Sequence, residues 1–216
     1  MHKQLKDFYK IALTYSSNAL EGNSLTEIET KTLLIDGITV GHKTLRETYE
    51  TLGHARAYEY MTTLLDSRQI TEDNIKHLHK LFYYNIEENQ AGVYRNTDKI
   101  IVGSQYKPTD AKNIFNDMND LCIWIIQNRD SYHPIEFASL LHLKFMFIHP
   151  FVDGNSRIAR LLMNMSLMQD GYLPVIIPHM LQDQYIESLD RGYTNPDEFV
   201  AFIRRECETQ LEVNNL

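Results

Sequence analysis

Apolar residues recur at three- and four-residue steps along most of this sequence, which is the spacing that places them on one face of an α-helix. The spacing predicts helices over residues 8–21, 25–35, 43–67, 72–86, 110–128, 134–148, 155–170, 181–190 and 196–212. Thr71, with Asn74 three positions later, is the start signal of the helix over 72–86. The sequence contains no Gly/Ser linker, charge block or repeat of roughly 20–50 residues, so it predicts one mainly α-helical domain over residues 1–216.

One segment, residues 93–107, departs from the helical spacing. It carries a β-branched cluster at 100–102 after turn residues at 96–98, and Pro108 follows it. This pattern is typical of a short β-hairpin. The expected fold class is therefore a helical bundle with one small hairpin.

The composition narrows the class of protein. At about 150 residues per domain, 216 residues correspond to between one and two domains, and 43% hydrophobic with 23% charged residues excludes a disordered chain. Two cysteines are too few for a disulfide framework or a thiolate zinc cluster and favour a reducing compartment. The net charge of −8 argues against a nucleic-acid partner. No apolar run reaches the roughly 20 residues of a membrane span, and the first ten residues do not lead into a signal peptide, so we expect a soluble cytoplasmic protein.

The most informative segment is HPFVDGNSRIAR, residues 149–160. It follows a stretch, residues 135–148, in which only four positions are polar, so that helix is expected to be buried nearly all round. Pro150 pushes the residue before it out of the α region, so the helix must stop at His149. His149 is thus expected at the end of a rigid buried helix, at the edge of the core.

Gly154 and Asn155 open the next predicted helix, and Arg157 and Arg160 lie in its first turns. The helix macrodipole disfavours each cation there by about 0.3–1 kcal/mol, so the two arginines need an anion. Backbone N–H groups at a helix start, a glycine and two guanidinium groups together suit a polyphosphate. Asp153 directly precedes them and offers the oxygen ligand that Mg²⁺ uses when it bridges phosphates.

Each of these residues taken alone is more often structural than catalytic. A His-Pro pair commonly marks only a helix boundary, and arginines near helix starts occur on solvated surfaces. A histidine, an acid, a helix start and two arginines within 12 residues are, however, the parts of phosphoryl or nucleotidyl transfer. The combination therefore indicates chemistry.

The sequence HPFVDGNSR resembles the signature HPFx(D/E)GN(G/K)R of Fic-domain proteins, which mostly attach AMP from ATP to a protein hydroxyl. IARLLMN and the later GYLPVII resemble the segment that follows the signature, and GVYRNTDKIIVGSQYKP, residues 92–108, resembles the flap that positions the target. The resemblance covers most of the chain and implies a Fic-type helical bundle with residues 149–160 as catalytic loop and helix start. Ser156 stands where the family has Gly or Lys; serine still supplies a backbone N–H unless that position needs a positive φ.

The resemblance implies a role for each residue of the signature. His149 would be the general base that takes the proton from a Ser, Thr or Tyr hydroxyl of a target protein, and Asp153 would hold Mg²⁺. The backbone N–H groups of Gly154, Asn155 and Ser156, together with the Asn155 side chain, would line the anion site. The resemblance also implies that Arg157 and Arg160 bind the β- and γ-phosphates of ATP. It further implies that the flap contacts the target through Ile101, Val102 and Gly103.

Glu21 is a second misplaced charge, near the N-terminus. The helix predicted over 8–21 is followed by Gly22 and Asn23, which suit a helix C-terminus. Glu21 would then lie in the last turn, where the macrodipole disfavours an anion. An arginine partner would reverse that effect.

Ser17-x-x-x-Glu21-Gly22 matches the (S/T)xxxE(G/N) inhibitory motif of the same family, in the N-terminal arrangement of its class II members. The resemblance implies that residues 1–24 are an inhibitory segment in which Glu21 pairs with Arg157. Ser17, one turn earlier, would help to orient the glutamate. The ordinary alternative is a capped surface helix.

Several alternatives stay open. Within the enzyme class they are removal of AMP from a modified target, with Glu21 positioning a water, and transfer of UMP or phosphocholine in place of AMP. A different class is a Fic-like binding module that pairs with a partner through the flap edge, against which the intact His149 and arginines argue. The sequence leaves undetermined the target, the nucleotide preference, the release signal and the oligomeric state, including a homodimer.

Overall fold

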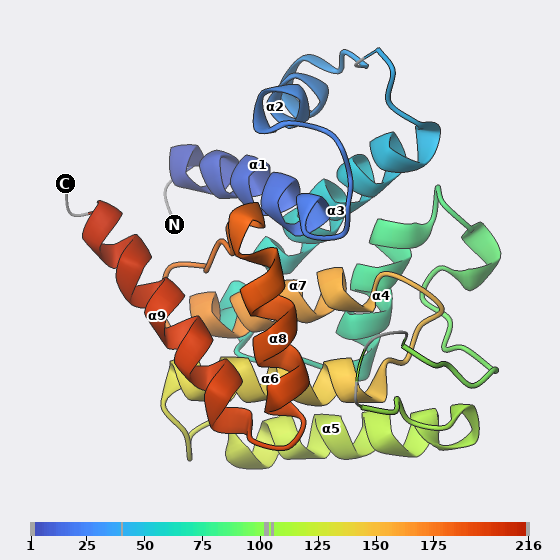
Figure 1. Cartoon of the computed structure of the whole chain (residues 1–216), viewed down its shortest axis with the longest axis vertical. Helices are drawn as coiled ribbons and strands as arrows, with labels where there is room; N and C mark the ends of the chain where they lie inside the picture. The colour runs from blue at the N-terminus through green and yellow to red at the C-terminus, as the bar shows by residue number, and fades with distance from the viewer. Residues whose placement is uncertain (1–2, 40, 102–103, 105, 215–216) are drawn as a thin grey trace.

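In the computed structural model, which describes residues 3–39, 41–101, 104 and 106–214, the chain consists of helices joined by loops (Figure 1). The α-helices are α1 (Lys3–Ala19), α2 (Glu27–Asp36), α3 (Leu45–Thr63), α4 (Glu72–Tyr83), α5 (Ile114–Asn128), α6 (Pro134–Ile148), α7 (Asn155–Gln169), α8 (Gln182–Gly192) and α9 (Pro196–Asn214). Short 3-10 turns are η1 (Leu65–Ser67), η2 (Glu88–Gln90), η3 (Ala111–Asn113) and η4 (His179–Leu181). The mainly α-helical class predicted from the spacing is confirmed.

Local sequence signals set several helix boundaries. The threonine N-caps of α2, α3 and α4, which include Thr71, each form a capping box, in which cap and third residue bond to each other's backbone. α6 has Pro134 at its start, where no backbone N–H is needed. It ends at Ile148, because Pro150 disfavours helical geometry for the residue before it.

α6 and α7 lie side by side at the centre of the molecule and are joined by the loop 149–154 (Figure 1). Most side chains of both helices are buried, which confirms the expectation for the helix before His149. α5 and α9 pack against α6, while α1, α3 and α4 pack against α7. The loop 149–154 therefore lies at one end of the central pair, within reach of the N-terminal helices.

Some predicted helix ends differ from the structure. The stretch 43–67 breaks after Thr63 into α3 and η1, and the helix predicted over 72–86 ends at Tyr83. α1 ends at Ala19, so Glu21 lies in the turn beyond the helix and not in its last turn.

The β-hairpin predicted over 93–107 is not found, since the described part of that segment contains no strand. β-branched residues favour a strand when neighbouring strands pack beside them. Here the guanidinium of the buried Arg95 instead binds the backbone carbonyls of Thr97, inside the segment, and Thr109, just beyond it. Val102 and Gly103, expected to contact the target, lie outside the described residues. Residues 92–108 are called the flap below.

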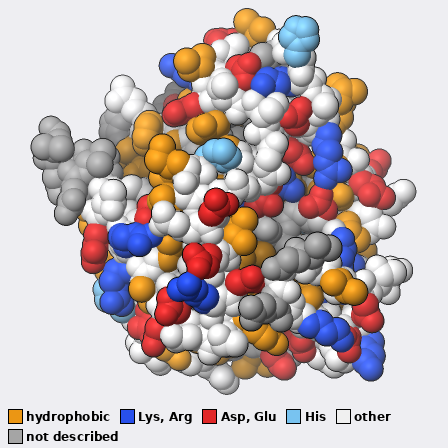
Figure 2. Space-filling view, viewed as in Figure 1, with side chains coloured by type: hydrophobic (Ala, Val, Ile, Leu, Met, Phe, Trp, Pro, Cys, Tyr) orange, Lys and Arg blue, Asp and Glu red, His pale blue; other side chains and the backbone are white. Residues whose placement is uncertain are grey.

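On the face seen in Figure 2, acidic and basic side chains are interspersed and no large basic patch is visible. This fits the net charge of −8. Among the helices of the described part, none combines the length and hydropathy of a membrane-spanning segment.

Candidate active site

His149 follows α6 in the left-handed region, with φ 51° and ψ 58°, while its backbone N–H still donates to the Phe145 carbonyl at 3.0 Å. Its own carbonyl accepts a hydrogen bond from Nε of Arg95 at 2.8 Å. The pKa of His149 is lowered to about 4, mainly by burial and then by the positive charges of Arg95 and Lys99. The imidazole is therefore neutral at pH 7, the state that a general base requires.

The loop after His149 is held by its own backbone and by α4. Gly154 is the N-cap of α7 with φ +77°, and a Cβ there would lie 2.7 Å from Cε1 of Phe82. The Asn155 side chain, expected at the anion site, is used in the loop instead. Its Oδ1 accepts from the Phe151 N–H and its Nδ2 donates to the Phe151 carbonyl, each at 2.9 Å. What Asn155 and Ser156 can offer an anion is their backbone N–H groups at the start of α7.

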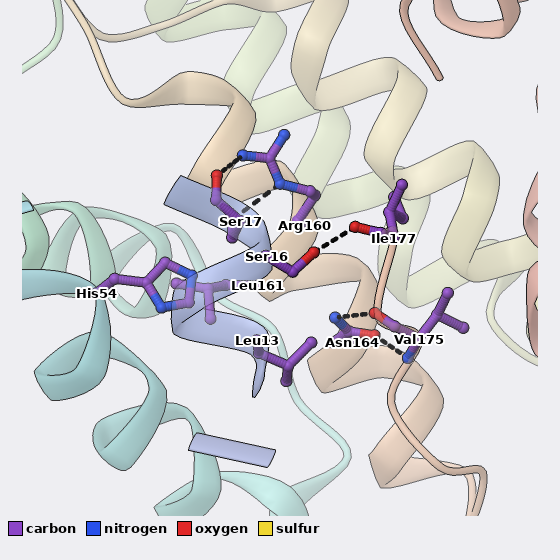
Figure 3. Close-up of a pocket in the computed structure, with 9 residues that line it drawn as sticks. All are labelled: Leu13, Ser16, Ser17, His54, Arg160, Leu161, Asn164, Val175 and Ile177. Atoms are coloured by element: carbon purple, nitrogen blue, oxygen red, sulfur yellow. Dashed lines mark hydrogen bonds between the residues drawn. The ribbon is translucent and has the colours of Figure 1, made fainter. Parts of the chain in front are cut away.

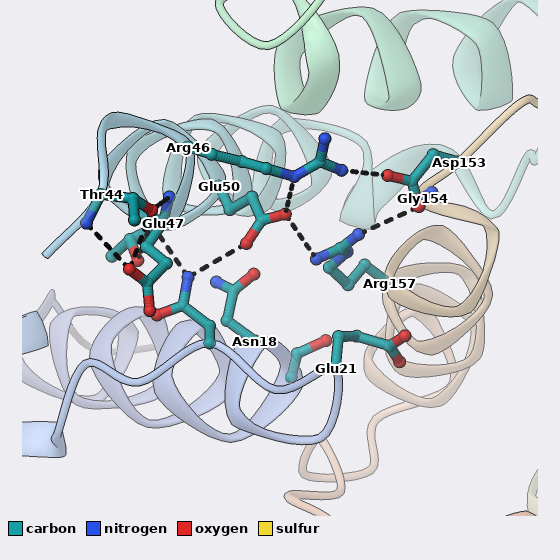
Figure 4. A network of polar contacts seen from close by, with 12 residues as sticks. Asn18, Glu21, Thr44, Arg46, Glu47, Glu50, Asp153, Gly154 and Arg157 are labelled. Carbon is teal, nitrogen blue, oxygen red and sulfur yellow. Dashed lines mark hydrogen bonds and ion pairs between the residues drawn. The ribbon is translucent and has the colours of Figure 1, made fainter.

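Arg157 is held by two carboxylates (Figure 4). Its Nη1 lies 3.3 Å from Oε1 of the buried Glu50, and its Nη2 lies 3.4 Å from Oδ1 of Asp153. Its guanidinium also lies 4.6 Å from the centre of the Phe82 ring. Arg46 of α3 contacts the same two carboxylates, bonding to Oδ2 of Asp153 and, at 3.2 Å, to Oε1 of Glu50.

Arg160 is held by α1, where Figure 3 shows its bonds to Ser17, and by Tyr185 of α8. Nε donates to Oγ of Ser17 at 2.8 Å, and Nη2 donates to the Ser17 carbonyl at 2.8 Å and to Oε1 of Glu21 at 2.9 Å. Nη1 donates to the hydroxyl of Tyr185 at 3.3 Å. Every nitrogen of this buried guanidinium therefore has a partner.

The predicted pairing of Glu21 with Arg157 is wrong: Glu21 pairs with Arg160. The two arginines are three positions apart on α7 and point toward different neighbours, because a helix turns by about 100° per residue. Arg157 faces Glu50 on α3, whereas Arg160 faces the C-terminal end of α1. Ser17 does lie beside the pair, but it contacts the arginine and not the glutamate.

The turn after α1 places Glu21. The N–H of Asn23 donates to the Asn18 carbonyl at 3.1 Å and the N–H of Gly22 to the Ala19 carbonyl at 3.0 Å, which is the Schellman pattern. Gly22 has the left-handed φ of +86° that this turn requires. The turn ends α1 before Glu21 and directs the carboxylate toward α7.

A cleft of about 520 Å³ lies beside these groups and has the size of a small-molecule site. His149 and Glu21 both line it, so the expected base and the expected inhibitory residue face one space. The cleft is also lined by Lys99, Ile101, Ser156 and Tyr185. Of the expected flap contacts within the described residues, Ile101 thus faces the cleft.

The sequence reasoning missed the partners of the two arginines. Glu50 and Tyr185 carried no motif, and the only local signal for Glu50 was its position four residues after Arg46 on one helix. The sequence assigns Arg95 no role beyond its place in the flap; in the structure its backbone N–H donates to the Pro150 carbonyl at 2.9 Å and so fastens the flap to the loop. These contacts join segments far apart in the chain.

The described residues contain no group of three His, Cys, Asp or Glu side chains that could hold a metal by themselves. Asp153 has a side chain 37% exposed, and its carboxylate is shared between Arg46 and Arg157. Burial raises the pKa of Asp153, but Arg157, the Gly154 N–H and Arg46 together outweigh it, so the pKa lies below its ordinary value. One ionised carboxylate fits a Mg²⁺ ion whose other ligands are nucleotide phosphates and water.

Residues 69–167 match the family model described as the Fic/DOC family. Over 98% of its length the chain is 35% identical to the protein adenylyltransferase Fic of Nematostella vectensis, of which it covers 50%. Over 92% of its length it is 34% identical to the protein adenylyltransferase Fic of Drosophila grimshawi, of which it covers 41%. The chain thus spans about half the length or less of the curated relatives that it matches.

Solved structures agree with these matches. Fic-1 from Caenorhabditis elegans, residues 134–508, superposes with a TM-score of 0.90 at 27% identity and covers 98% of this chain and 65% of that one. A Fic domain-containing signalling protein from Bacteroides thetaiotaomicron has a TM-score of 0.85 at 28% identity and covers 95% of this chain and 87% of that one. The residues that match the Fic/DOC family model, 69–167, include the signature at 149–160.

Proposed function

We propose that this domain transfers AMP from ATP to a hydroxyl side chain of a target protein and that Glu21 restrains the transfer. One observation carries the proposal: the neutral imidazole of His149, the start of α7 and the carboxylate of Glu21 border one cleft. A general base and a helix start that binds anions suit group transfer from a nucleotide. An acidic side chain that can leave the site suits regulation of that transfer. The names of the curated relatives point to the same activity.

In this reaction His149 takes the proton of the target hydroxyl, and the oxygen forms a bond to the α-phosphorus of ATP. The bond from that phosphorus to the bridging oxygen breaks, and pyrophosphate leaves. The target keeps AMP as a phosphodiester. The backbone N–H groups of Gly154, Asn155 and Ser156 stabilise charge on the phosphates, and Asp153 holds the Mg²⁺ that neutralises phosphate charge when it is bound.

Arg157 and Arg160 are the residues that grip the β- and γ-phosphates. The carboxylate of Glu21 accepts a hydrogen bond from Nη2 of Arg160, so a phosphate oxygen must displace that carboxylate to bind the same N–H. Nε and Nη1 are engaged by Ser17 and Tyr185, which contact Arg160 independently of Glu21. Because Nη2 also donates to the Ser17 carbonyl, loss of Glu21 frees one N–H of Nη2 while Ser17 and Tyr185 keep the guanidinium in place.

The test is self-modification with labelled ATP and Mg²⁺. Glu21→Gly is expected to raise labelling by about tenfold or more, and addition of His149→Ala to that variant should reduce it by at least about 100-fold. Asp36→Gly is the matched control, because Asp36, like Glu21, directly precedes a left-handed glycine at the C-terminal end of a helix, here Gly37. Equal labelling of the wild type and Glu21→Gly would contradict the inhibitory role, and no labelling of either would contradict AMP transfer.

A second candidate function is removal of AMP from a modified target. It is favoured by the place of Glu21, whose side chain remains 27% exposed and lines the same cleft as His149. There the carboxylate could position a water for attack on the phosphodiester. Release of AMP from a premodified protein by the wild type, and its loss in Glu21→Gly, would support removal.

A further inference from the structure

His79 of α4 is fully buried and makes two hydrogen bonds, one to each of two functional segments. Its Nδ1 accepts from the backbone N–H of Gly92 at 2.8 Å. Its Nε2 lies 3.0 Å from the carbonyl oxygen of Asp153. The ring is stacked on that of Phe151, with centroids 3.7 Å apart and planes within 4°.

These two partners define the tautomer of His79. A backbone N–H can only donate, so Nδ1 carries a lone pair; a carbonyl can only accept, so Nε2 carries the proton. Both bonds exist only in the neutral ring. The pKa of His79 is lowered to about 4, chiefly by burial, which keeps that ring neutral at pH 7.

The two segments that His79 joins are the flap and the loop before α7. Gly92 is the first flap residue, with φ +77°, and a Cβ there would lie 2.9 Å from the Lys76 carbonyl, so its backbone is packed closely on α4. Asp153 is the proposed Mg²⁺ residue and precedes the N-cap Gly154. Arg95, three residues into the flap, fastens it to the Pro150 carbonyl in the same loop. His79 therefore adds a second connection, through a side chain of α4.

We infer that His79 is a positioning residue, whose ring sets the place of the Asp153 backbone relative to the flap while a nucleotide and a target bind. The expected effect of His79 on kcat rests on the proposed function. A buried core histidine without this role would need only shape and stacking. The distinction is testable because the two ring nitrogens have different partners.

Three substitutions in the Glu21→Gly background separate the two contacts. The amide of His79→Gln extends to the place of Nε2 and can donate to Asp153. The amide of His79→Asn reaches the place of Nδ1 and can accept from Gly92. His79→Phe keeps a stacked ring and loses both bonds. His77→Gln is the matched control, since His77 is an exposed histidine two positions away on the same helix.

Three quantities are measured on each variant: the Mg²⁺ concentration that half-saturates ATP binding in calorimetry, the kcat of self-modification, and the hydrogen exchange rate of the Gly92 amide. His79→Phe should raise the half-saturating Mg²⁺ concentration and lower kcat by about tenfold or more. His79→Gln should recover both values but exchange the Gly92 amide faster. His79→Asn should protect that amide and recover neither value. His77→Gln should match its parent.

The inference is overturned if His79→Phe matches its parent in Mg²⁺ dependence and kcat, or if Gln and Asn lose equally in every measurement. If His79→Phe does not fold, the contrast between Gln and Asn still decides. If the Glu21→Gly parent neither binds ATP nor transfers AMP, the proposed function has failed. The inference is then judged separately by Gly92 exchange and by ¹⁵N shifts of His79, which must report a proton on Nε2; a proton on Nδ1 overturns it.

Discussion

The carboxylate of Asp153 is contacted by guanidinium groups from two directions, Arg46 on α3 and Arg157 on α7. The side chain of Arg46 is 55% exposed, whereas that of Arg157 is 5% exposed and its guanidinium lies over the Phe82 ring. Water therefore screens the Arg46–Asp153 pair, which costs little free energy to separate. The Arg157–Asp153 pair is part of the packed site. A Mg²⁺ ion that binds Asp153 has to compete with the exposed arginine.

Removal of Arg46 should make Mg²⁺ binding easier. We expect Arg46→Ala to lower the Mg²⁺ concentration that half-saturates ATP binding by about two- to fivefold, the range of an exposed ion pair. Calorimetric titration of ATP at several Mg²⁺ concentrations measures it. Arg205→Ala is the control, because Arg205 is equally exposed on α9 and pairs with Glu206. A higher Mg²⁺ requirement in Arg46→Ala, or no change, would show that Asp153 and Arg46 do not compete with the ion.

At the scale of elements, the end of α1 decides where the inhibitory carboxylate lies. The Schellman turn needs a left-handed residue at Gly22, and nothing lies within 4 Å of a Cβ built there. A substitution at Gly22 therefore acts through the backbone and not through a steric clash. Such a substitution would relax the turn that directs Glu21 toward Arg160.

We expect Gly22→Ala to lower the melting temperature by a few degrees, since the left-handed conformation costs an alanine about 1 kcal/mol. It should also raise self-modification, though less than Glu21→Gly does. Thermal unfolding and labelling with ATP measure the two effects. Gly37→Ala is the control: Gly37 is also a left-handed glycine after a helix, and its Cβ would also meet open space, so stability should fall while labelling stays unchanged. In Gly22→Ala, a drop in stability with unchanged labelling would separate the turn from the inhibition.

For the whole molecule, the main electrostatic feature is a set of histidines kept neutral in the interior. The pKa is lowered to about 3 for His54 and to about 4 for His79 and His149, and it lies well below the ordinary value for His142. Burial is the first cause in each case. His142 is fully buried, and its Nε2 lies 2.9 Å from the Tyr185 hydroxyl.

This set predicts how stability depends on pH. Below about pH 6.5 the unfolded chain binds protons on these histidines and the folded chain does not, so stability is fully present above pH 6.5 and falls as the pH drops toward 4. Each histidine contributes a slope of up to about 1.4 kcal/mol per pH unit. Urea unfolding at pH 7.5, 6.0 and 5.0 measures it. His142→Phe should reduce the slope; a stability independent of pH between 7.5 and 5.0 would contradict the prediction.

Much of the helical framework could be predicted because its causes are local. A threonine cap at Thr71, a proline at 150 and a glycine at 154 act on the few residues beside them, so their effect is readable from the chain. The flap shows the limit of local reasoning. Its β-branched residues favour a strand, yet in the described residues the segment is held by the side chain of Arg95.

The charges of the site divide in the same way. That two arginines near the start of α7 require anions followed from the sequence alone, because the helix dipole opposes cations there. Which carboxylate each arginine meets did not, because Arg157 and Arg160 are three positions apart and only the packing of α3 and α1 on α7 brings Glu50 to one and Glu21 to the other. Helix boundaries and the need for counter-charges were thus determined within short stretches of chain, whereas the pairing of charges was decided by the tertiary structure, since it depends on how helices distant in sequence pack together.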